Sequence, residues 1–269
     1  MLSMTSDYAA DTGCPGPYLQ RIAEAGFTHV HWCHHWSTDF LYADSEVEQI
    51  ARWFTEFGLE LTDLHASAGQ EKGWVSYREY ERLAGVELVR NRIDMTARLG
   101  ADVIILHLPG PPASTESQAA YWDRVWESLD ALRRPAEAAG VRIAIENGNF
   151  NDIERVLAHY DDSYVGLCYD SGHGNMLPDG LDRLERLEDR LISIHLHDNN
   201  GREDQHKIPF TGTIDWPRLT RIIAESAYTK WVSLETTTRH AGIADEAAFL
   251  AAAHQAASGL AEMIEAARP

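Results

Sequence analysis

The chain has little positive charge and no long hydrophobic run. It contains 269 residues with a formal net charge of −19, and only three residues are lysines. Such a negative field repels polyanions, so the composition disfavours nucleic acid as a partner. No uninterrupted apolar stretch approaches the roughly 20 residues of a membrane helix, so the sequence predicts no membrane span.

Cysteine is also scarce, and its placement argues against a disulfide framework. The three cysteines, Cys14, Cys33 and Cys168, show no paired spacing. An odd, unpatterned count is typical of proteins in a reducing compartment. The first residues lack the basic region and apolar run of a signal peptide. We therefore expect a cytoplasmic location.

The chain does show a regular alternation of strand-like and helix-like segments. We predict strands at Leu2–Thr5, Thr28–Trp32, Leu59–His65, Asp102–His107, Val141–Glu146, Tyr164–Asp170, Leu191–His195 and Trp231–Glu235. We predict helices at Pro17–Ala25, Ser45–Phe57, Tyr77–Leu99, Thr115–Ala139, Asp152–His159, Asp179–Asp189, Trp216–Ser226 and Asp245–Ala267. Alternating elements imply a parallel sheet. The number of elements and the chain length predict an α/β fold, a single (β/α)8 TIM barrel that forms one domain over residues 1–269.

Six of the predicted strands end in a side chain that can bind a metal. These side chains are His65, His107, Glu146, Asp170, His195 and Glu235. The carboxyl ends of barrel strands converge on one face, so we expect the six to meet in one pocket. Glu146, Asp170 and Glu235 would repel one another there without a cation. Together with His195 they form a ligand set that suits Mn²⁺, Mg²⁺, Co²⁺ or Zn²⁺.

A second group of polar side chains lies near the same strand ends. It comprises His65, His107, His173, Asp204 and His206. Four imidazoles and one carboxylate are a zinc-like mixture, so more than one bound ion is one interpretation. The same residue types also serve as acid–base or hydrogen-bonding groups for a substrate, and this is the interpretation we favour.

Several residues are predicted to contact a substrate. They are His173, His197, Arg202, Trp32 and Trp74. Side chains of a strand alternate between faces, so His197 points the same way as His195. Arg202 lies in the long loop of residues 199–214, and long loops in compact domains are often functional. Trp32 near the barrel mouth and Trp74 in a glycine-rich loop could each stack on a sugar ring.

Eight short motifs together resemble those of the xylose isomerase-like TIM-barrel superfamily, which includes sugar isomerases, sugar epimerases and the endonuclease IV enzymes. The motifs are LHAS (64–67), HLPG (107–110), IENG (145–148), YDSGH (169–173), HLHD (195–198), DQH (204–206), GTIDW (212–216) and LET (234–236). In the isomerase and epimerase branch, the resemblance implies that Glu146, Asp170, His195 and Glu235 hold one divalent metal. The two glutamates would also act as acid and base, and His173 would touch substrate oxygens.

The endonuclease IV branch implies a different metal content. There, nine matching positions hold three zinc ions, and all nine carry the matching residue types in this chain. They are His65, His107, Glu146, Asp170, His173, His195, Asp204, His206 and Glu235. Endonuclease IV enzymes typically continue the glutamate motif as ENTAGQG, whereas residues 146–150 read ENGNF. Phe210-Thr-Gly212 also replaces the Gly-x-Gly of the isomerase-like branch.

These observations predict a divalent-metal-dependent isomerase or epimerase of a small keto or hydroxy sugar, or of a sugar-like polyol, acting through an enediolate. The alternatives are a multi-zinc phosphodiesterase that cleaves abasic DNA and a polyol dehydratase or lyase with the same metal site. A non-catalytic sugar-binding barrel is disfavoured, because binding alone does not require three convergent carboxylates. The sequence leaves open the substrate and the oligomeric state, a homo-oligomer included.

Overall fold

Eight parallel strands form the centre of the molecule. The computed structural model describes residues 1–10, 13–110 and 117–268. The strands are β1 (Leu2–Thr5), β2 (His29–Trp32), β3 (Glu60–His65), β4 (Val103–His107), β5 (Arg142–Glu146), β6 (Val165–Asp170), β7 (Leu191–His195) and β8 (Val232–Leu234). Their spatial order is β7-β6-β5-β4-β3-β2-β1-β8, and every ladder is parallel.

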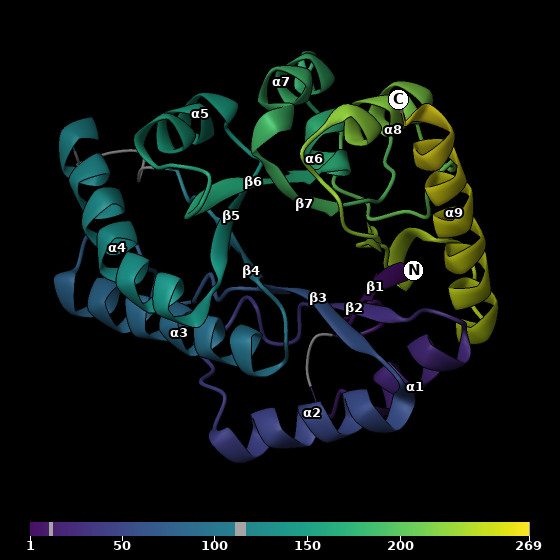
Figure 1. The fold of residues 1–269 in the computed structure, drawn as a ribbon, viewed down its shortest axis with the longest axis horizontal. Helices are drawn as coiled ribbons and strands as arrows, with labels where there is room; N and C mark the ends of the chain where they lie inside the picture. Colours follow the sequence, from purple (N-terminus) through teal and green to yellow (C-terminus); the bar gives the residue numbers. More distant parts are fainter. Residues whose placement is uncertain (11–12, 111–116, 269) are drawn as a thin grey trace.

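The two end strands of this order meet and close the barrel. Leu196, just after β7, forms a parallel bridge with Leu234 of β8. The Leu196 amide donates to the Ser233 carbonyl at 2.9 Å, and the Glu235 amide donates to the Leu196 carbonyl at 3.1 Å. The predicted (β/α)8 barrel is therefore confirmed (Figure 1). The bond at Glu235 also ties the end of β8 to the end of β7.

A ring of helices surrounds the strands in Figure 1. Among the described residues the α-helices are α1 (Gly16–Glu24), α2 (Asp44–Phe57), α3 (Glu79–Arg98), α4 (Gln118–Ala139), α5 (Phe150–His159), α6 (Ser171–Asn175), α7 (Gly180–Leu187), α8 (Trp216–Glu225) and α9 (Glu246–Ala267). None of these helices is long and apolar enough to cross a bilayer.

The predicted elements are largely confirmed, with two corrections and one untested end. The short helix α6 was not predicted, because five residues are too few to show a helical period. The predicted helix Asp179–Asp189 is wrong at its end, where a 3-10 turn, Glu188–Arg190, follows α7. The predicted start of Thr115–Ala139 lies outside the described residues.

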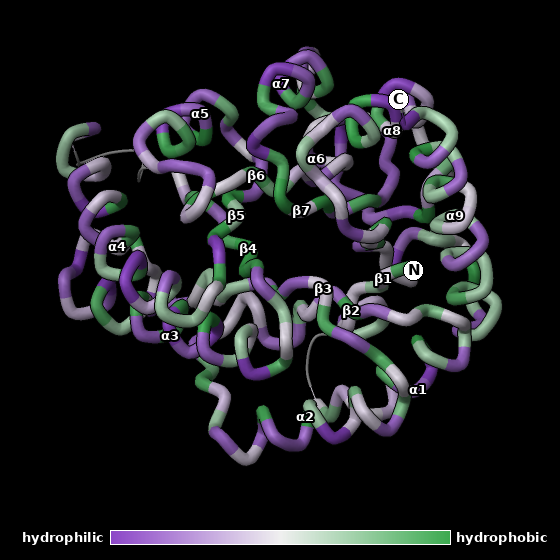
Figure 2. The backbone as a smooth tube through the Cα atoms, viewed as in Figure 1, coloured by the Kyte–Doolittle hydropathy of each residue, from purple (hydrophilic) through white to green (hydrophobic). Residues whose placement is uncertain are grey.

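Side chains of the strands alternate between the barrel interior and the helical ring. On β2, Val30 and Trp32 belong to the large apolar core beneath the helices, whereas His31 is buried against Asp63 of the neighbouring strand. A second, smaller apolar cluster comprises Val103, Ile105, Ala144, Cys168 and Ile192. By strand alternation, Val103, Ile105, Ala144 and Cys168 lie beneath the strand-end ligands, and Ile192 lies at the register shift between β6 and β7. Figure 2 shows hydrophobic residues along β4 and β7, and mixed character along the outer helices.

Helix α3 approaches the loop before it very closely at a glycine. A Cβ atom on Gly85 would lie 2.5 Å from the Trp74 nitrogen and 2.6 Å from the Gly73 carbonyl carbon. Both neighbours are backbone atoms, so a side chain at this position cannot be accommodated without moving the loop. The close approach also leaves Trp74 only 1 % exposed.

We expect Gly85→Ala to destabilise the protein by about 1–3 kcal/mol, because overpacking shifts backbone and side chains. Gly73→Ala is the matched control: it lies across the same contact, but its Cβ would have no neighbour within 4 Å. Urea unfolding followed by circular dichroism measures both variants. Equal stability of Gly85→Ala and Gly73→Ala would contradict the close packing described here.

Candidate metal centre and active site

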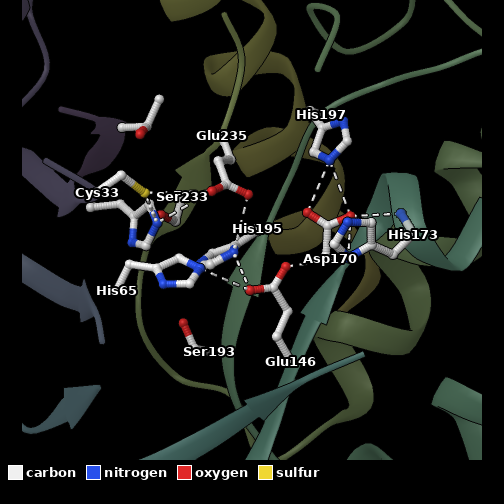
Figure 3. Close-up of polar contacts among 12 residues, drawn as sticks. Cys33, His65, Glu146, Asp170, His173, Ser193, His195, His197, Ser233 and Glu235 are labelled. Atoms are coloured by element: carbon white, nitrogen blue, oxygen red, sulfur yellow. Dashed lines mark hydrogen bonds and ion pairs between the residues drawn. The ribbon is translucent and has the colours of Figure 1, made fainter. Parts of the chain in front are cut away.

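Four predicted ligands come together at the carboxyl ends of the last four strands. Glu146 ends β5, Asp170 ends β6, His195 ends β7, and Glu235 follows β8 directly. His195 Nδ1 lies 3.2 Å from Glu235 Oε2 and 3.5 Å from Glu146 Oε2. Figure 3 shows Asp170 beside this group, with His173 and His197 around it. The parallel ladders thus bring side chains that are far apart in sequence into one pocket.

Several buried atoms of this group have no hydrogen-bond partner in the described part of the chain. They are both ring nitrogens of His195 and Oε2 of Glu146. Buried polar atoms in folded proteins are nearly always paired, so unpaired atoms need an explanation. Carboxylate oxygens and an imidazole nitrogen that face each other without hydrogen bonds fit the ligand shell of a divalent cation. Glu146, Asp170, His195 and Glu235 are the residues that would hold it.

Asp170 is held in place from several directions. Its Oδ1 accepts from the His173 amide at 2.7 Å, and its main-chain amide donates to Asn147 Oδ1 at 2.5 Å. His197 Nε2 lies 2.9 Å from Asp170 Oδ2, and the His197 ring stacks on His206 with centroids 4.0 Å apart. His197 is fully buried and these contacts support Asp170, while substrate contact by His197 stays a prediction.

Two further histidines face Glu146 from the other side. His65 Nε2 and His107 Nε2 lie 3.4 and 3.5 Å from Glu146 Oε2, and 3.2 Å from each other. His65 Nδ1 donates to the Ala66 carbonyl at 3.1 Å, which leaves its Nε2 to face Glu146 when the ring is neutral. Trp36 covers both rings, with centroids 4.6 Å from His65 and 5.5 Å from His107.

A third cluster is formed by His173 and two residues of the long loop. His173 Nε2 and His206 Nε2 lie 3.3 and 3.1 Å from Asp204 Oδ2. His206 Nδ1 donates to the Glu235 carbonyl at 2.7 Å, and His206 has a positive φ of 47°. A left-handed conformation is uncommon for a residue other than glycine and occurs most often at functional sites. The nine predicted residues therefore form one connected set.

The imidazoles control the ionisation of the carboxylates. Burial raises the pKa of Glu146, but the nearby His107 and His195 outweigh it and hold this pKa well below its usual range. Glu235 behaves alike: burial raises its pKa, and His195 lowers it well below normal. Burial lowers the pKa of His206, but its hydrogen bond to Asp204 prevails and raises this pKa to about 10. Neighbouring imidazoles thus favour the ionised form of both glutamates.

Two hollows in the described structure adjoin the centre. One has a volume of about 330 Å³ and is lined in part by Tyr8, Trp36, Glu235 and Arg239. The other has a volume of about 210 Å³ and is lined in part by Glu146. Ligand pockets start near 300 Å³, so the larger hollow by itself has a size that suits a small molecule. Tyr8, Trp36 and Arg239 were not predicted, because they lie outside the strand-end motifs.

A model of one protein family matches most of the chain. This model, the xylose isomerase-like TIM barrel, matches residues 19–253. The chain belongs to this family. Because the match covers more than half of the chain, it confirms the predicted superfamily.

Relatives from bacteria extend this result. The chain is 34% identical over 279 positions to uncharacterized protein y4fM of Sinorhizobium fredii, covering 93% of this chain and 89% of that protein. It is 21% identical to D-psicose 3-epimerase of Ruminiclostridium cellulolyticum, covering 84% and 79% of the two chains. It is 22% identical to inosose dehydratase of Clostridium beijerinckii, covering 66% and 70%.

Solved structures share the fold over nearly the whole length. A D-psicose 3-epimerase crystallised in the presence of D-fructose superimposes with a TM-score of 0.81 at 19% identity, covering 98% of this chain and 99% of that one. The IOLI protein with a bound zinc atom superimposes with a TM-score of 0.74 at 16% identity, covering 98% of both chains.

Three residues expected to bind substrate in this family member lie elsewhere. Trp32 is fully buried and donates from Nε1 to Tyr42 at 3.1 Å, because strand alternation turns it toward the helices. Trp74 is buried too, and its Nε1 donates to the His107 carbonyl at 3.2 Å, so it anchors the loop. Arg202 is exposed and lines neither hollow. Trp32 and Trp74 thus line neither hollow, Trp36 lines the larger one, and substrate contact by Arg202 stays a prediction.

We expect Gly172→Ala to lower metal affinity by about 10–100-fold, because groups that orient a ligand are worth that much. A Cβ at Gly172 would lie 2.0 Å from Cε1 of His197, so the ring that holds Asp170 must move. Gly148→Ala is the control, since its Cβ would meet nothing within 4 Å. Isothermal titration with Mn²⁺ compares the two, and matching affinities would contradict the role of His197.

Proposed function

We propose that the protein is a divalent-metal-dependent isomerase or epimerase of a small keto or hydroxy sugar, or of a sugar-like polyol. The observation that carries the proposal is the placement of two glutamates. Glu146 and Glu235 both approach His195, and each lines a different hollow. Two carboxylates on opposite sides of one reacting carbon can remove a proton on one side and return one on the other. The relative named D-psicose 3-epimerase supports this reaction class.

Glu146, Asp170, His195 and Glu235 would hold the metal, and the zinc atom of the IOLI structure supports a metal in this fold. When bound, the ion would supply Lewis-acid stabilisation of the negative charge that develops on an enediolate. The chain itself supplies the proton transfers. One glutamate takes the proton next to the substrate carbonyl. The other, once it has accepted a proton from a substrate hydroxyl or from solvent, gives a proton to the same carbon or its neighbour.

The remaining polar residues suit the recognition of hydroxyl groups. His107 and His173 line the smaller hollow beside Glu146, and His206 lines the larger one beside Glu235. Each could donate or accept a hydrogen bond. Trp36 forms an aromatic wall of the larger hollow, on which a sugar ring can pack. Lys207 donates to the Thr211 carbonyl at 2.8 Å and lines neither hollow, so its position does not favour a phosphorylated substrate.

A multi-zinc phosphodiesterase is the second candidate. The observation that favours it is the pair of extra clusters, His65–His107–Glu146 and His173–Asp204–His206, each with a carboxylate oxygen between two imidazoles. Such clusters resemble zinc shells in their donor types. The net charge of −19 disfavours a DNA backbone as the substrate. A polyol dehydratase, as the relative from Clostridium beijerinckii is named, is a third candidate.

Metal stoichiometry separates the first two candidates. We expect plasma emission spectrometry to find about one tightly bound divalent ion per chain after dialysis, the content of a single catalytic site. His65→Gln together with His206→Gln should leave that number unchanged, because neither residue belongs to the four-ligand centre. A content near three zinc ions, reduced by the double variant, would favour the phosphodiesterase, and cleavage of abasic duplex DNA would then establish it.

Solvent exchange tests the proton transfers. In deuterium oxide, we expect the protein to incorporate deuterium next to the carbonyl of at least one member of a ketose panel. Glu146→Gln and Glu235→Gln should each lower this exchange about 10²–10⁴-fold, the typical contribution of a general acid or base. Glu203→Gln, at an exposed loop residue outside both hollows, is the control. Loss of water from an inosose-type substrate would instead indicate a dehydratase, and no exchange with any ketose would count against the proposal.

A further inference from the structure

A group of buried polar side chains lies inside the barrel, next to the metal centre. His31 of β2 is 0 % exposed, and Asp63 of β3, Ser193 of β7 and Cys33 are each 1 % exposed. Barrel interiors are ordinarily filled with bulky apolar residues. Burying a charge is costly unless it is paired, so this group requires a reason to be there. None of the four residues was predicted to take part in the site.

Hydrogen bonds link the group in sequence, from Ser193 through Asp63 to His31. Asp63 Oδ2 accepts from the Ser193 hydroxyl, and Asp63 Oδ1 lies 2.5 Å from His31 Nδ1. A carboxylate accepts hydrogen bonds, so the proton of this contact is on His31 Nδ1. His31 and Asp63 are also opposite each other in the β2–β3 ladder, which fixes the distance between their backbones. The imidazole is therefore held at one edge and can turn only slightly.

The free edge of His31 faces Glu235. His31 Nε2 lies 3.6 Å from Glu235 Oε1 and 2.8 Å from Cys33 Sγ, and Cys33 Sγ lies 3.5 Å from the same Oε1. The other oxygen of this carboxylate, Oε2, lies 3.2 Å from His195 Nδ1. One oxygen of Glu235 thus faces the barrel interior, and the other faces the metal centre.

Glu235 requires such support more than Glu146 does. Strand β8 has only three residues, and Glu235 lies beyond its end, whereas Glu146 is inside β5. The Glu235 side chain is 12% exposed, against 1% for Glu146. Within 4 Å, the Glu146 carboxylate contacts His65, His107, His173 and His195, whereas the ion pairs described for Glu235 are those with His31 and His195.

We propose that His31 and Asp63 are positioning residues, which together with the Cys33 thiol hold Glu235 Oε1 so that Oε2 is directed at the metal. The proposal rests on the proposed function in that Glu235 is taken as a metal ligand. Hydrogen-bonded partners that orient the ligands of a metal are a general requirement of such sites. The Cys33 sulfur itself is buried and lines neither hollow, so it does not reach a substrate as a nucleophile.

Cobalt binding tests the proposal, because the visible spectrum of Co²⁺ reports the arrangement of its ligands. We expect Asp63→Asn and His31→Gln to weaken Co²⁺ binding about 10–100-fold and to change the spectrum of the loaded protein. Thr62→Val is the matched control. Thr62 is the buried neighbour of Asp63 on β3, and its hydroxyl makes no hydrogen bond within the described residues, so it takes no part in the chain of contacts to Glu235.

A double variant covers the case in which a single change prevents folding. His31→Leu combined with Asp63→Val removes both partners of the buried pair, and such apolar replacement is often tolerated where loss of one partner is not. Ser193→Ala, which removes only the hydroxyl that donates to Asp63, is a milder variant. Both should shift the cobalt spectrum in the same direction as the single variants.

The outcomes separate this inference from the proposed function. Wild-type affinity and spectrum in any folded variant at His31 or Asp63 would overturn the positioning role and leave the metal-dependent function intact. Absence of cobalt binding in the wild-type protein would overturn both. A thiolate-to-cobalt charge-transfer band that disappears in Cys33→Ser would also overturn the positioning role, because His31 and Cys33 would then be ligands of an ion themselves.

Discussion

Carboxylates that share a buried pocket repel one another, and the mouth of this barrel is organised around that repulsion. Glu146, Asp170 and Glu235 each have an imidazole within 4 Å. The nearby imidazoles hold the pKa of both glutamates well below normal in spite of burial. A site that already balances several negative charges with histidines is prepared for a cation, which can take over part of that balance. The charge pattern, more than any single contact, supports the proposed metal site.

The hydrogen-bonded backbone of the barrel holds these charged side chains close together in spite of their repulsion. A closed parallel barrel pairs every strand, so the ligands stand on backbone that cannot easily move apart to relieve the repulsion. The bridge from Leu196 to Leu234 is the last step of that closure, and the neighbouring Glu235 amide takes part in it. Rigid strands therefore carry Glu146, Asp170 and His195, whereas the loop that carries Asp204 and His206 reaches over them. The loop completes the site, but the strands define it.

The strand-end ligands could be predicted because an apolar run that ends in His, Asp or Glu is visible in sequence. The placement of other residues depends on which side of a strand they occupy and on how the loops fold, and neither is visible in the sequence. Trp32 was predicted to face the substrate, but its position on β2 turns its side chain toward the helices. Trp36 lies in the loop after β2, where no strand or helix periodicity indicates which way a side chain points. The segment Leu59–His65 mixes polar and apolar residues, and this mixture reflects its position: Asp63 is polar because it points into the barrel. The positive φ values of His206 and Phe210 are set by tertiary contacts and leave no local signature.

The two glutamates differ in what supports them, and that difference bears on how such a site can change its chemistry. Glu146 is contacted by histidines at the mouth, where His107 and His173 line a hollow and can exchange their contacts for a substrate or a further ion. Glu235 is contacted from within the barrel, where nothing can be exchanged without disturbing the core. Glu146 therefore depends on contacts at the mouth that a substrate or an ion could replace, whereas Glu235 depends in part on contacts inside the barrel. The two glutamates of the proposed acid–base pair are thus supported by different parts of the fold.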